Sequence, residues 1–432
     1  MKKRKKRAIV IGTGAGGATM AKELQGEYQV TILEVGKEFK PFSYPIDLFA
    51  KLRRTGLLFD ERLIRLLLPN MIIDKTKDMV LVRGFGKGGT TTLATGNAVR
   101  CDGALKELGI NLDREYEELY RELPVTTDHQ KRWTKTTKRM FSLFEEMGLD
   151  PVVTPKLLCA EKCISCGHCA IGCPKGAKWD TRAWVDEAVE KGARLITGCK
   201  VTDFEIENGK VTAVNGRMGL RKVRLRADLV VLAAGGLGTP VILEKSGITC
   251  QKSLFVDPVL CVAGPLPGIR QDCQILMPFI SQQDGYILSP YMDYLSFFFD
   301  KRWRLPMRNI ASIMIKLADQ EKGSTDGKHV DKTMSTVDNS NMDKAVAQCR
   351  EILTLLGVPE EKQFLGTLNA GHPGGMLPLT AEEAETLHNP KLPENLYVAD
   401  ATILPKAMGN PPILTIMALT KKMAGVILER AK

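Results

Sequence analysis

Residues 7–17 read Arg-Ala-Ile-Val-Ile-Gly-Thr-Gly-Ala-Gly-Gly, and residues 29–34 read Gln-Val-Thr-Ile-Leu-Glu. The first stretch predicts a strand that ends in a glycine turn, and a helical pattern follows it to about Leu24. The second predicts another strand, which ends at Glu34, 22 positions after Gly12. Strand, glycine turn, helix, strand and acid in this order are typical of a dinucleotide-binding βαβ unit.

Each residue of this motif has a physical task in such a unit. Gly12 makes the tight turn, Gly14 lets the backbone approach a pyrophosphate, and Gly17 allows the helix to pack closely on the strand. The helix N-terminus then faces the phosphate charge. Glu34 is expected to accept hydrogen bonds from ribose hydroxyls, and its charge disfavours the 2′-phosphate of NADP. The motif does not distinguish NAD from FAD.

Composition places the chain among globular proteins. It has 432 residues, which corresponds to two or three domains. Hydrophobic residues make up 44% and charged residues 26%, which excludes collagen, coiled-coil, disordered and disulfide-scaffold classes. The longest uncharged apolar run, residues 229–243, is short and broken by glycines, so no transmembrane segment is expected.

The net charge is +11, and much of this excess lies in residues 1–7. We interpret this run as a solvated tail, with a docking site for an acidic redox partner or an anionic lipid surface as the alternative. The rest of the chain has no basic helix and no aromatic-rich basic stretch, so a nucleic-acid partner is not expected. We expect a cytoplasmic protein, with peripheral attachment to a membrane as the alternative.

Further segments fit an α/β chain. Residues 35–80 are expected to contain helical, basic-rich segments, such as the apolar run 63–68 flanked by arginines. Residues 83–100 form a glycine- and threonine-rich loop suited to a pyrophosphate or a flavin edge. Residues 228–234 predict a buried parallel strand that runs into Gly235. Residues 396–399 predict a strand that ends at Asp400, and residues 411–429 predict a helix.

Four cysteines form a dense motif. Residues 163–174 read Cys-Ile-Ser-Cys-Gly-His-Cys-Ala-Ile-Gly-Cys-Pro, the spacing of bacterial ferredoxins. The spacing predicts a [4Fe–4S] site on Cys163, Cys166, Cys169 and Cys173. A distant thiol, Cys159 or Cys199, is an alternative fourth ligand. A structural zinc knuckle and plain buried thiols are the alternative interpretations of the motif.

Together these motifs resemble the glucose–methanol–choline oxidoreductase family, in particular its branch with cholesterol oxidases and long-chain alcohol dehydrogenases. The resemblance rests on the glycine turn with Glu34 and on several further motifs. These are Gly88-Gly89-Thr90-Thr91, residues 166–178, Ala233-Ala234-Gly235, His372-Pro373-Gly374-Gly375, and Ala399-Asp400 through Asn410-Pro411.

The resemblance implies FAD as the dinucleotide and hydride transfer from an alcohol to the flavin as the chemistry. It implies that His372 is the general base and Asn410 its partner. The residue chemistry agrees, because a hydroxyl proton must leave with the hydride, and His372 lies in a turn with little need for histidine packing. The expected cofactor-binding residues are Gly12, Gly14, Gly17, Glu34, Gly88, Gly89, Thr90, Asn97, Val201, Ala234, Gly235, Asp400 and Pro411. Asn97 comes later than the asparagine usual in the family, whose place Ala94 takes.

The expected fold is therefore α/β: a discontinuous, doubly wound, Rossmann-like FAD domain with a smaller antiparallel-sheet substrate domain. The expected division is residues 1–110, 181–250 and 371–432 for the FAD domain, 111–180 for a helical and cysteine-rich segment, and 251–370 for the substrate domain.

The expected activity is oxidation of a CH–OH group. Electrons would pass from FAD through the cluster to a redox partner such as ferredoxin, a quinone or another carrier. The alternatives are a ferredoxin-fed carbonyl or enone reductase, an electron-transfer flavoprotein subunit without its own alcohol substrate, and an NAD-binding protein with a zinc knuckle.

Overall fold

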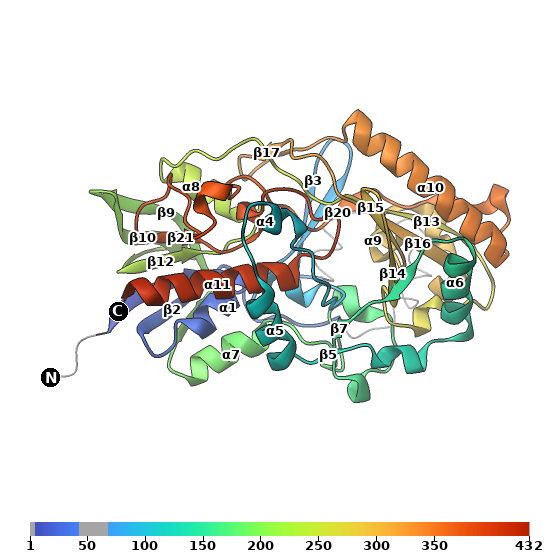
Figure 1. Cartoon of the computed structure of the whole chain (residues 1–432), viewed down its shortest axis with the longest axis horizontal. Coiled ribbons are helices and arrows are strands. Elements are labelled where there is room, and N and C mark those ends of the chain that lie inside the picture. Colours follow the sequence, from blue (N-terminus) through green and yellow to red (C-terminus); the bar gives the residue numbers. More distant parts are fainter. Residues whose placement is uncertain (1–4, 43–67, 432) are drawn as a thin grey trace.

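The computed structural model describes residues 5–42 and 68–431. A parallel sheet with the order β21-β12-β1-β2-β8 forms one end of the molecule, where both termini lie (Figure 1). Its strands are β1 (Lys6–Ile11), β2 (Tyr28–Glu34), β8 (Arg194–Thr197), β12 (Leu229–Leu232) and β21 (Leu396–Val398). The strands predicted at the glycine turn, before Glu34, before Gly235 and before Asp400 are all members of this sheet.

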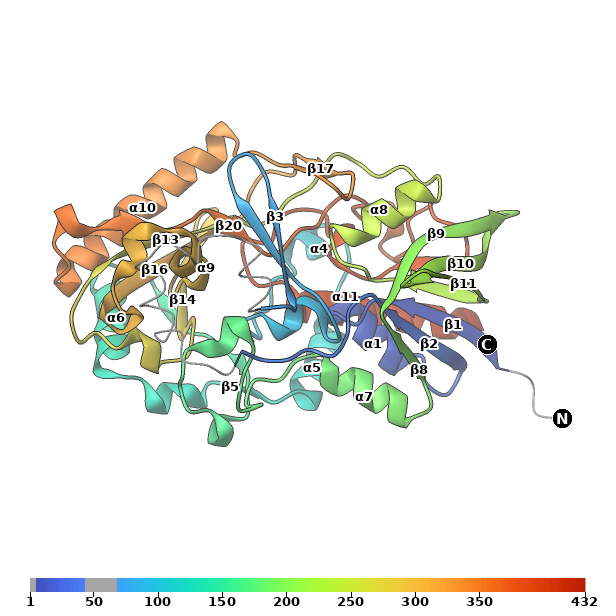
Figure 2. The same ribbon diagram turned by 180° about the vertical axis from the view of Figure 1, so that it is seen from behind.

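Helices pack on one side of the parallel sheet and a small antiparallel sheet packs on the other (Figure 2). The helices are α1 (Ala15–Glu23), α5 (Asp113–Glu122), α7 (Arg182–Glu190) and α11 (Ile413–Ala431). The small sheet consists of β9 (Cys199–Glu207), β10 (Lys210–Met218) and β11 (Arg221–Arg226), and α8 (Gly238–Lys245) packs on β9. Strand β12 is buried on both faces, which explains its continuous apolar sequence.

A nine-stranded sheet forms the other end of the molecule, with the path β3-β4-β20-β13-β16-β15-β14-β6 and β19 beside β13. Its pairs are antiparallel except for β4 and β20, which run parallel. Helix α10 (Thr336–Leu356) and α6 (Lys135–Glu146) cover it and share its hydrophobic core. The strands are β3 (Met71–Lys75), β4 (Val80–Gly84), β6 (Pro151–Val153), β13 (Val259–Pro265), β14 (Phe279–Gln283), β15 (Tyr286–Pro290), β16 (Ile310–Leu317), β19 (Phe364–Leu365) and β20 (Asn369–Ala370). Shorter elements are α4 (Gly103–Glu107), α9 (Tyr294–Phe299), β5 (Val125–Thr126), β7 (Lys156–Leu157), β17 (Ser324–Thr325) and β18 (Val330–Asp331).

The helical segments expected within residues 35–80 centre on residues 63–68, and residues 43–67 lie outside the described residues, so this expectation stays a prediction. Residues 71–84 form the antiparallel hairpin of β3 and β4, which projects between the two ends of the molecule (Figure 2). Short apolar runs do not distinguish a strand from a buried helix, and pairing with a neighbouring strand decided the outcome. Residues 43–67 and the basic residues 1–4 lie outside the described residues. The large sheet also takes strands from outside residues 251–370, and the five-part division of the chain stays a prediction.

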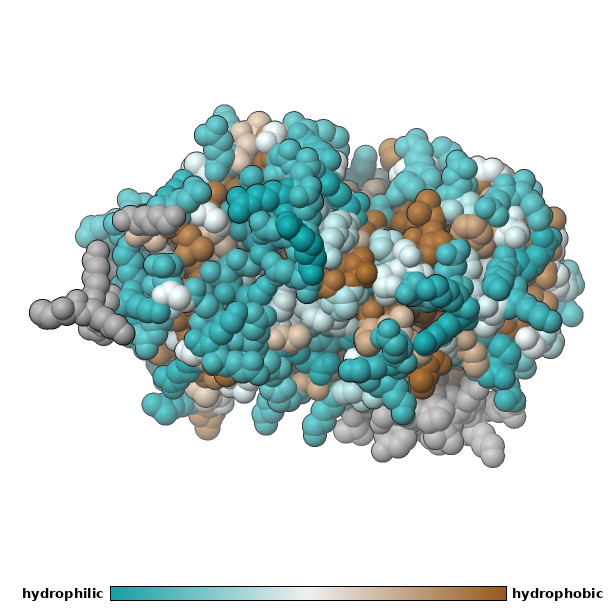
Figure 3. Space-filling view, turned by 60° about the horizontal axis from the view of Figure 1, so that its bottom comes forward, coloured by the Kyte–Doolittle hydropathy of each residue, from teal (hydrophilic) through white to brown (hydrophobic). Residues whose placement is uncertain are grey.

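The surface seen in Figure 3 is mostly hydrophilic, with hydrophobic residues in small patches among hydrophilic ones. The two largest hydrophobic cores among the described residues lie in the two ends of the molecule, one with the parallel sheet and one with the nine-stranded sheet. Within residues 5–42 and 68–431, the structure contains no helix with the length and apolar character needed to span a bilayer.

Candidate active site

A crevice is expected at the carboxyl edge of the parallel sheet. The chain leaves β1 toward β2 on one side, while β12 lies on the other side of β1, so the strand order reverses at this point. Open α/β sheets bind ligands outside the carboxyl ends of such strands. Gly12 and Ala233 directly follow β1 and β12, Glu34 ends β2, and Asp400 comes two residues after β21.

The glycine turn between β1 and α1 forms an anion cradle. Gly12 has φ of +100°, and a Cβ atom there would lie 2.1 Å from the carbonyl oxygen of Ala233. A Cβ atom on Gly17 would lie 2.1 Å from the carbonyl oxygen of Gly12. In contrast, a Cβ atom on Gly14 would meet nothing within 4 Å. Helix α1 begins there without a side-chain cap, so its first N–H groups have no side-chain acceptor, and their binding of a pyrophosphate stays a prediction.

Gly14→Val is expected to reduce the amount of flavin bound while leaving the melting temperature of the flavin-free protein nearly unchanged. Gly14 has φ of −69°, which any residue adopts, and the valine would fill the space before α1. Gly12→Ala is the contrasting variant, because its methyl group would clash with the backbone and lower the stability of the fold itself. Flavin absorbance per chain and thermal unfolding of the flavin-free proteins measure the two effects. Equal flavin content in Gly14→Val and the unmodified protein would contradict the cradle.

Glu34 is buried and already bonded within the chain. Its Oε2 accepts from the Thr13 hydroxyl at 2.5 Å and its Oε1 accepts from the Gly36 N–H at 2.8 Å. The carboxylate therefore fixes the glycine turn against the end of β2, and its contact with a ribose stays a prediction.

Asp400 ties the ends of two strands together. Its Oδ2 accepts from the Gly235 N–H at 2.8 Å and from the Thr239 hydroxyl at 2.5 Å. Burial raises the pKa of Asp400, and these hydrogen bonds act in the opposite direction. Asp400 thus orients Gly235 after β12.

Val201 is buried on β9, in the small sheet.

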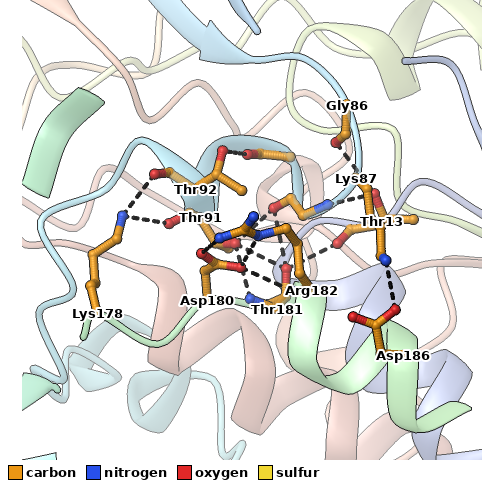
Figure 4. Close-up of polar contacts among 12 residues, drawn as sticks. Thr13, Gly86, Lys87, Thr91, Thr92, Lys178, Asp180, Thr181, Arg182 and Asp186 are labelled. Carbon is orange, nitrogen blue, oxygen red and sulfur yellow. Dashed lines mark hydrogen bonds and ion pairs between the residues drawn. The ribbon is translucent and has the colours of Figure 1, made fainter. Parts of the chain in front are cut away.

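The glycine- and threonine-rich loop is fixed by hydroxyl groups and one lysine (Figure 4). The Gly88 N–H donates to the Thr13 hydroxyl at 3.0 Å, and the Thr181 hydroxyl donates to the carbonyl of Thr13 at 3.0 Å. The ammonium of Lys178 donates to the carbonyls of Thr91 and Thr92 at 3.2 and 2.7 Å. Because Lys178 follows the cysteine motif, this loop links the glycine turn to the cysteine segment.

A cavity of about 1010 Å³, including its open mouth, collects several predicted residues. Thr90, Asn97, His372 and Pro411 all line it. Its other walls are largely apolar and include Met71, Leu93, Ala170, Ile171, Met277, Tyr291, Tyr294, Phe298 and Met314. This combination of an apolar lining and a few convergent polar groups is typical of a small-molecule site.

His372 is a half-buried residue on the wall of this cavity. Its Nδ1 is buried and has no hydrogen-bond partner among the described residues. Burial, followed by the charge of Lys316, holds the pKa of His372 well below its usual value. The ring is therefore neutral at physiological pH, the form in which an imidazole accepts a proton.

Asn410 does not line this cavity as its side chain stands. Its Nδ2 donates to Oε1 of Gln282 at 2.7 Å, and its Oδ1 is buried without a partner in the part of the chain that the structure describes. Asn410 precedes Pro411 and helix α11, and its carbonyl accepts from the ammonium of Lys316 at 3.1 Å. The pairing of Asn410 with His372 stays a prediction.

Sequence reasoning missed a buried ion pair in the cavity. Lys316 lines it, is 1% exposed, and lies 2.5 Å from Oδ2 of the fully buried Asp257. Burial raises the pKa of Asp257 to about 6, while Lys316 acts to lower it. The signal was present in the sequence, because Lys316 interrupts the otherwise apolar strand β16 and a charge in such a strand needs a partner.

Replacing this pair by Lys316→Met with Asp257→Asn is expected to move the acid limb of kcat/KM to higher pH. The ordinary pKa of histidine is about 6.5, and the charge of Lys316 helps to hold the pKa of His372 below it. Removing that charge raises the pKa of His372, so the base becomes protonated, and the rate falls, at a higher pH. The pH profile of kcat/KM measures the shift. The matched control is Lys332→Met with Asp319→Asn, the other buried pair at 2.6 Å, which does not line the cavity. Equal profiles for both double variants would contradict the coupling of Lys316 to His372.

The cysteine motif surrounds a second hollow, of about 350 Å³ including its open side. Cys163, Cys166, Cys169 and Cys173 all line it, whereas Cys159 and Cys199, the alternative ligands, do not. Within the described ranges, no three His, Cys, Asp or Glu side chains stand close enough together to hold a metal ion. The iron–sulfur centre therefore stays a prediction.

Backbone N–H groups point at the sulfur atoms around this hollow. Ser165 donates to Sγ of Cys163 at 3.5 Å and Ala177 donates to Sγ of Cys173 at 3.3 Å. Burial raises the pKa of Cys166 and of Cys169, while backbone hydrogen bonds from His168 and Leu276 act to lower them. N–H donors to every sulfur stabilise thiolates and are typical of thiolate-bound metal centres.

The two hollows share a wall. Ala170 and Ile171, within the cysteine motif, line the large cavity. Tyr294 also lines that cavity, and its hydroxyl donates to the carbonyl of Gly167, which lines the cysteine hollow, at 2.7 Å. The cysteine hollow and the large cavity are therefore neighbours, with Ala170, Ile171 and Tyr294 in the wall between them.

Comparisons with known families agree with this arrangement. Residues 7–265 match the family described as GMC oxidoreductase, and residues 175–400 match the family described as FAD dependent oxidoreductase. The first match covers more than half of the chain.

Individual proteins show the same relationship. An uncharacterised protein of Methanocaldococcus jannaschii is 28% identical over 97% of this chain and 99% of its own length. The long-chain-alcohol oxidase FAO1 of Arabidopsis thaliana is 23% identical over 67% of this chain, which spans 48% of the plant protein. The crystal structure of pyridoxine 4-oxidase from Mesorbium loti is 14% identical, with a TM-score of 0.71 over 98% of this chain and 99% of its own, which shows a shared fold.

Proposed function

The chain belongs to the GMC oxidoreductase family of FAD-dependent enzymes, and from this premise we propose that it is an alcohol dehydrogenase that passes electrons to a [4Fe–4S] cluster. The observation that carries the proposal is the wall shared by the cysteine hollow and the cavity of His372. The expected α/β fold with a Rossmann-like FAD domain is confirmed by the family and the structural likeness.

In the proposed chemistry the alcohol loses two hydrogens to two different acceptors, one as a hydride from carbon and one as a proton from oxygen. When bound, FAD supplies the hydride acceptor, and oxidation of a carbinol to a carbonyl then releases one proton. His372 would take this proton, because its ring is neutral and its buried Nδ1 lacks a partner among the described residues. Lys316 is held next to the cavity by Asp257, where its positive charge would favour the developing alkoxide.

The cysteine hollow would hold the centre through which electrons pass from the flavin to an external carrier. An iron–sulfur cluster accepts electrons one at a time, so its presence favours a one-electron carrier over dioxygen as the acceptor. Wall residues Ala170, Ile171 and Tyr294 would lie between the two centres. The same groups would serve the reverse reaction, reduction of a carbonyl by a low-potential carrier.

Anaerobic purification followed by spectroscopy tests this proposal. We expect flavin absorption bands over a broad cluster absorption, and about four iron atoms per chain. Rapid mixing with primary and secondary alcohols should then bleach the flavin, and assays from the carbonyl side determine the preferred direction. Flavin with zinc in place of iron would contradict the electron route, and failure of every alcohol to bleach the flavin would contradict the dehydrogenase.

A further inference from the structure

Two lysines are buried beside the cysteine hollow without a carboxylate partner. Lys156 is 1% exposed and Lys178 is 5% exposed. Neither forms an ion pair with an Asp or Glu among the residues that the structure describes, in contrast to Lys316 and Lys332 in the same protein. A buried ammonium is costly unless an anion compensates it, so these two positions call for negative charge nearby.

Lys178 lies on the wall of the cysteine hollow, and its ammonium forms its hydrogen bonds with carbonyl oxygens. The charge of Asp180 also acts on Lys178, but the ion pair of Asp180 is with Arg182. Lys178 donates to the carbonyls of Ala94 at 2.6 Å and Cys169 at 3.1 Å, in addition to those of Thr91 and Thr92 (Figure 4). Carbonyl dipoles satisfy its hydrogen bonds but leave its net charge in place. The four thiols are the acidic groups that share this wall.

Lys156 lies between the two hollows. Its ammonium donates to Oδ1 of Asn97, which lines the large cavity, and to the carbonyl of Leu276 at 2.7 Å. The backbone N–H of Leu276 in turn bonds to Cys169. Burial lowers the pKa of Lys156 to about 7, and charge on Cys169 and Cys163 acts in the opposite direction. The same lysine thus contacts a wall residue of the large cavity and lies close enough to the thiols for their charge to act on it.

Lys156 also fixes the orientation of Asn97. Because Oδ1 of Asn97 accepts from Lys156, its Nδ2 is directed to Sδ of Met277, at 3.0 Å. Asn97 is 2% exposed and is therefore held in one orientation at the cavity wall. A change of charge at Lys156 would reach both hollows through this contact.

We propose that Lys156 and Lys178 are the counter-charges of a metal–thiolate centre on the four cysteines, and that Lys156 sets the reduction potential of that centre from its position next to Asn97. The inference rests on the proposed function for the identity of the centre. A [4Fe–4S] cluster with four thiolate ligands carries a charge of about −2 when oxidised and about −3 when reduced. Two buried ammonium groups would balance the oxidised state and favour the added electron of the reduced state.

Lys156→Met in the full-length protein tests the potential. We expect the one-electron equilibrium to shift about tenfold toward the oxidised cluster, equivalent to about 59 mV, in a redox titration followed by electron paramagnetic resonance. Lys156→Gln, which also lacks the charge but can donate to Asn97, should show the same shift and separates charge from hydrogen bonding. Lys175→Met is the matched control, because Lys175 lines the same hollow but is exposed, so solvent screens its charge. Equal potentials in all three variants would overturn the inference.

Stability of the metal-free protein gives a second readout that a merely structural role would not reproduce. After the metal is removed with a chelator, Lys156 is an uncompensated buried cation below its pKa of about 7, so metal-free Lys156→Met should melt at a higher temperature than the metal-free unmodified protein when both are measured below pH 7. A lower melting temperature in both states would overturn the inference.

Metal analysis separates this inference from the proposed function. Zinc in the hollow, with less metal bound in Lys156→Met, would support the counter-charge while contradicting the electron route. A flavoprotein whose hollow takes up neither iron nor zinc would overturn both.

Discussion

Replacing His372 by alanine is expected to slow reduction of the flavin by an alcohol by about 10²- to 10⁴-fold. The alanine cannot accept the hydroxyl proton, and hydride leaves the carbinol carbon much more slowly while that proton remains, because the product is then a protonated carbonyl. His372 lies on the cavity wall with a buried Nδ1 that has no partner among the described residues, so its removal breaks no hydrogen bond there. Rapid mixing of anaerobic enzyme with alcohol, followed at the flavin absorbance, measures the rate.

The control for this variant is His329→Ala, because His329 is exposed and pairs only with Asp326 on its own turn. It should reduce its flavin at the unmodified rate. Both variants should bind the same amount of flavin and accept electrons from dithionite equally well. An unchanged rate in His372→Ala would contradict its role as the base. It would favour the alternative of an electron-transfer subunit without its own alcohol substrate.

Replacing Cys166 by serine is expected to remove most of the iron, from about four atoms per chain to near zero. Sγ of Cys166 lines the cysteine hollow and accepts a backbone hydrogen bond from His168. A serine hydroxyl in its place would not be a comparable ligand for iron. Transfer of electrons to a one-electron acceptor should be lost with the cluster. Reduction of the flavin by alcohol should persist, because the cysteine hollow is separate from His372. Iron analysis and stopped-flow absorbance measure the two effects.

Cys273→Ser is the matched control for the cluster. Cys273 lies outside the cysteine hollow and contacts Arg270 at 2.6 Å. Its replacement should leave the iron content and both electron-transfer steps unchanged. Full iron content in Cys166→Ser would show that the hollow does not hold the metal through this thiol. Loss of flavin reduction together with iron would contradict the separation of the two steps.

Most of the fold follows from local sequence patterns. Three local features predict parallel strands: the glycine turn after β1, the acid at the end of β2 and the continuous apolar sequence of β12. The structure joins all three strands in one sheet. Helix α11 begins two residues later than expected, at Ile413 in place of Pro411. The hairpin of β3 and β4 was not predicted as such, because its apolar runs of three and four residues carry no clear period and its pairing partner β20 lies almost 300 residues away.

The candidate site was only partly accessible from the sequence. His372, Asn97, Thr90 and Pro411 were predicted from motifs, and the structure collects them around one cavity. Asn410 was predicted from the same resemblance, yet its amide bonds to Gln282. The choice among rotamers of a side chain depends on which groups fold against it, and the motif contains no information about Gln282.

The sequence by itself determined the two motifs that depend on residue spacing. These are a glycine turn of the phosphate-binding type and four thiols at the intervals found in ferredoxins. Such features act over a few residues, and local geometry fixes them. Only the tertiary structure decided that Lys316 meets Asp257 and that Lys156 reaches Asn97, across 59 positions of the chain in each case. The cost of burying a charge depends on what the folded chain places beside it, and that neighbourhood exists only after segments far apart in the sequence have paired.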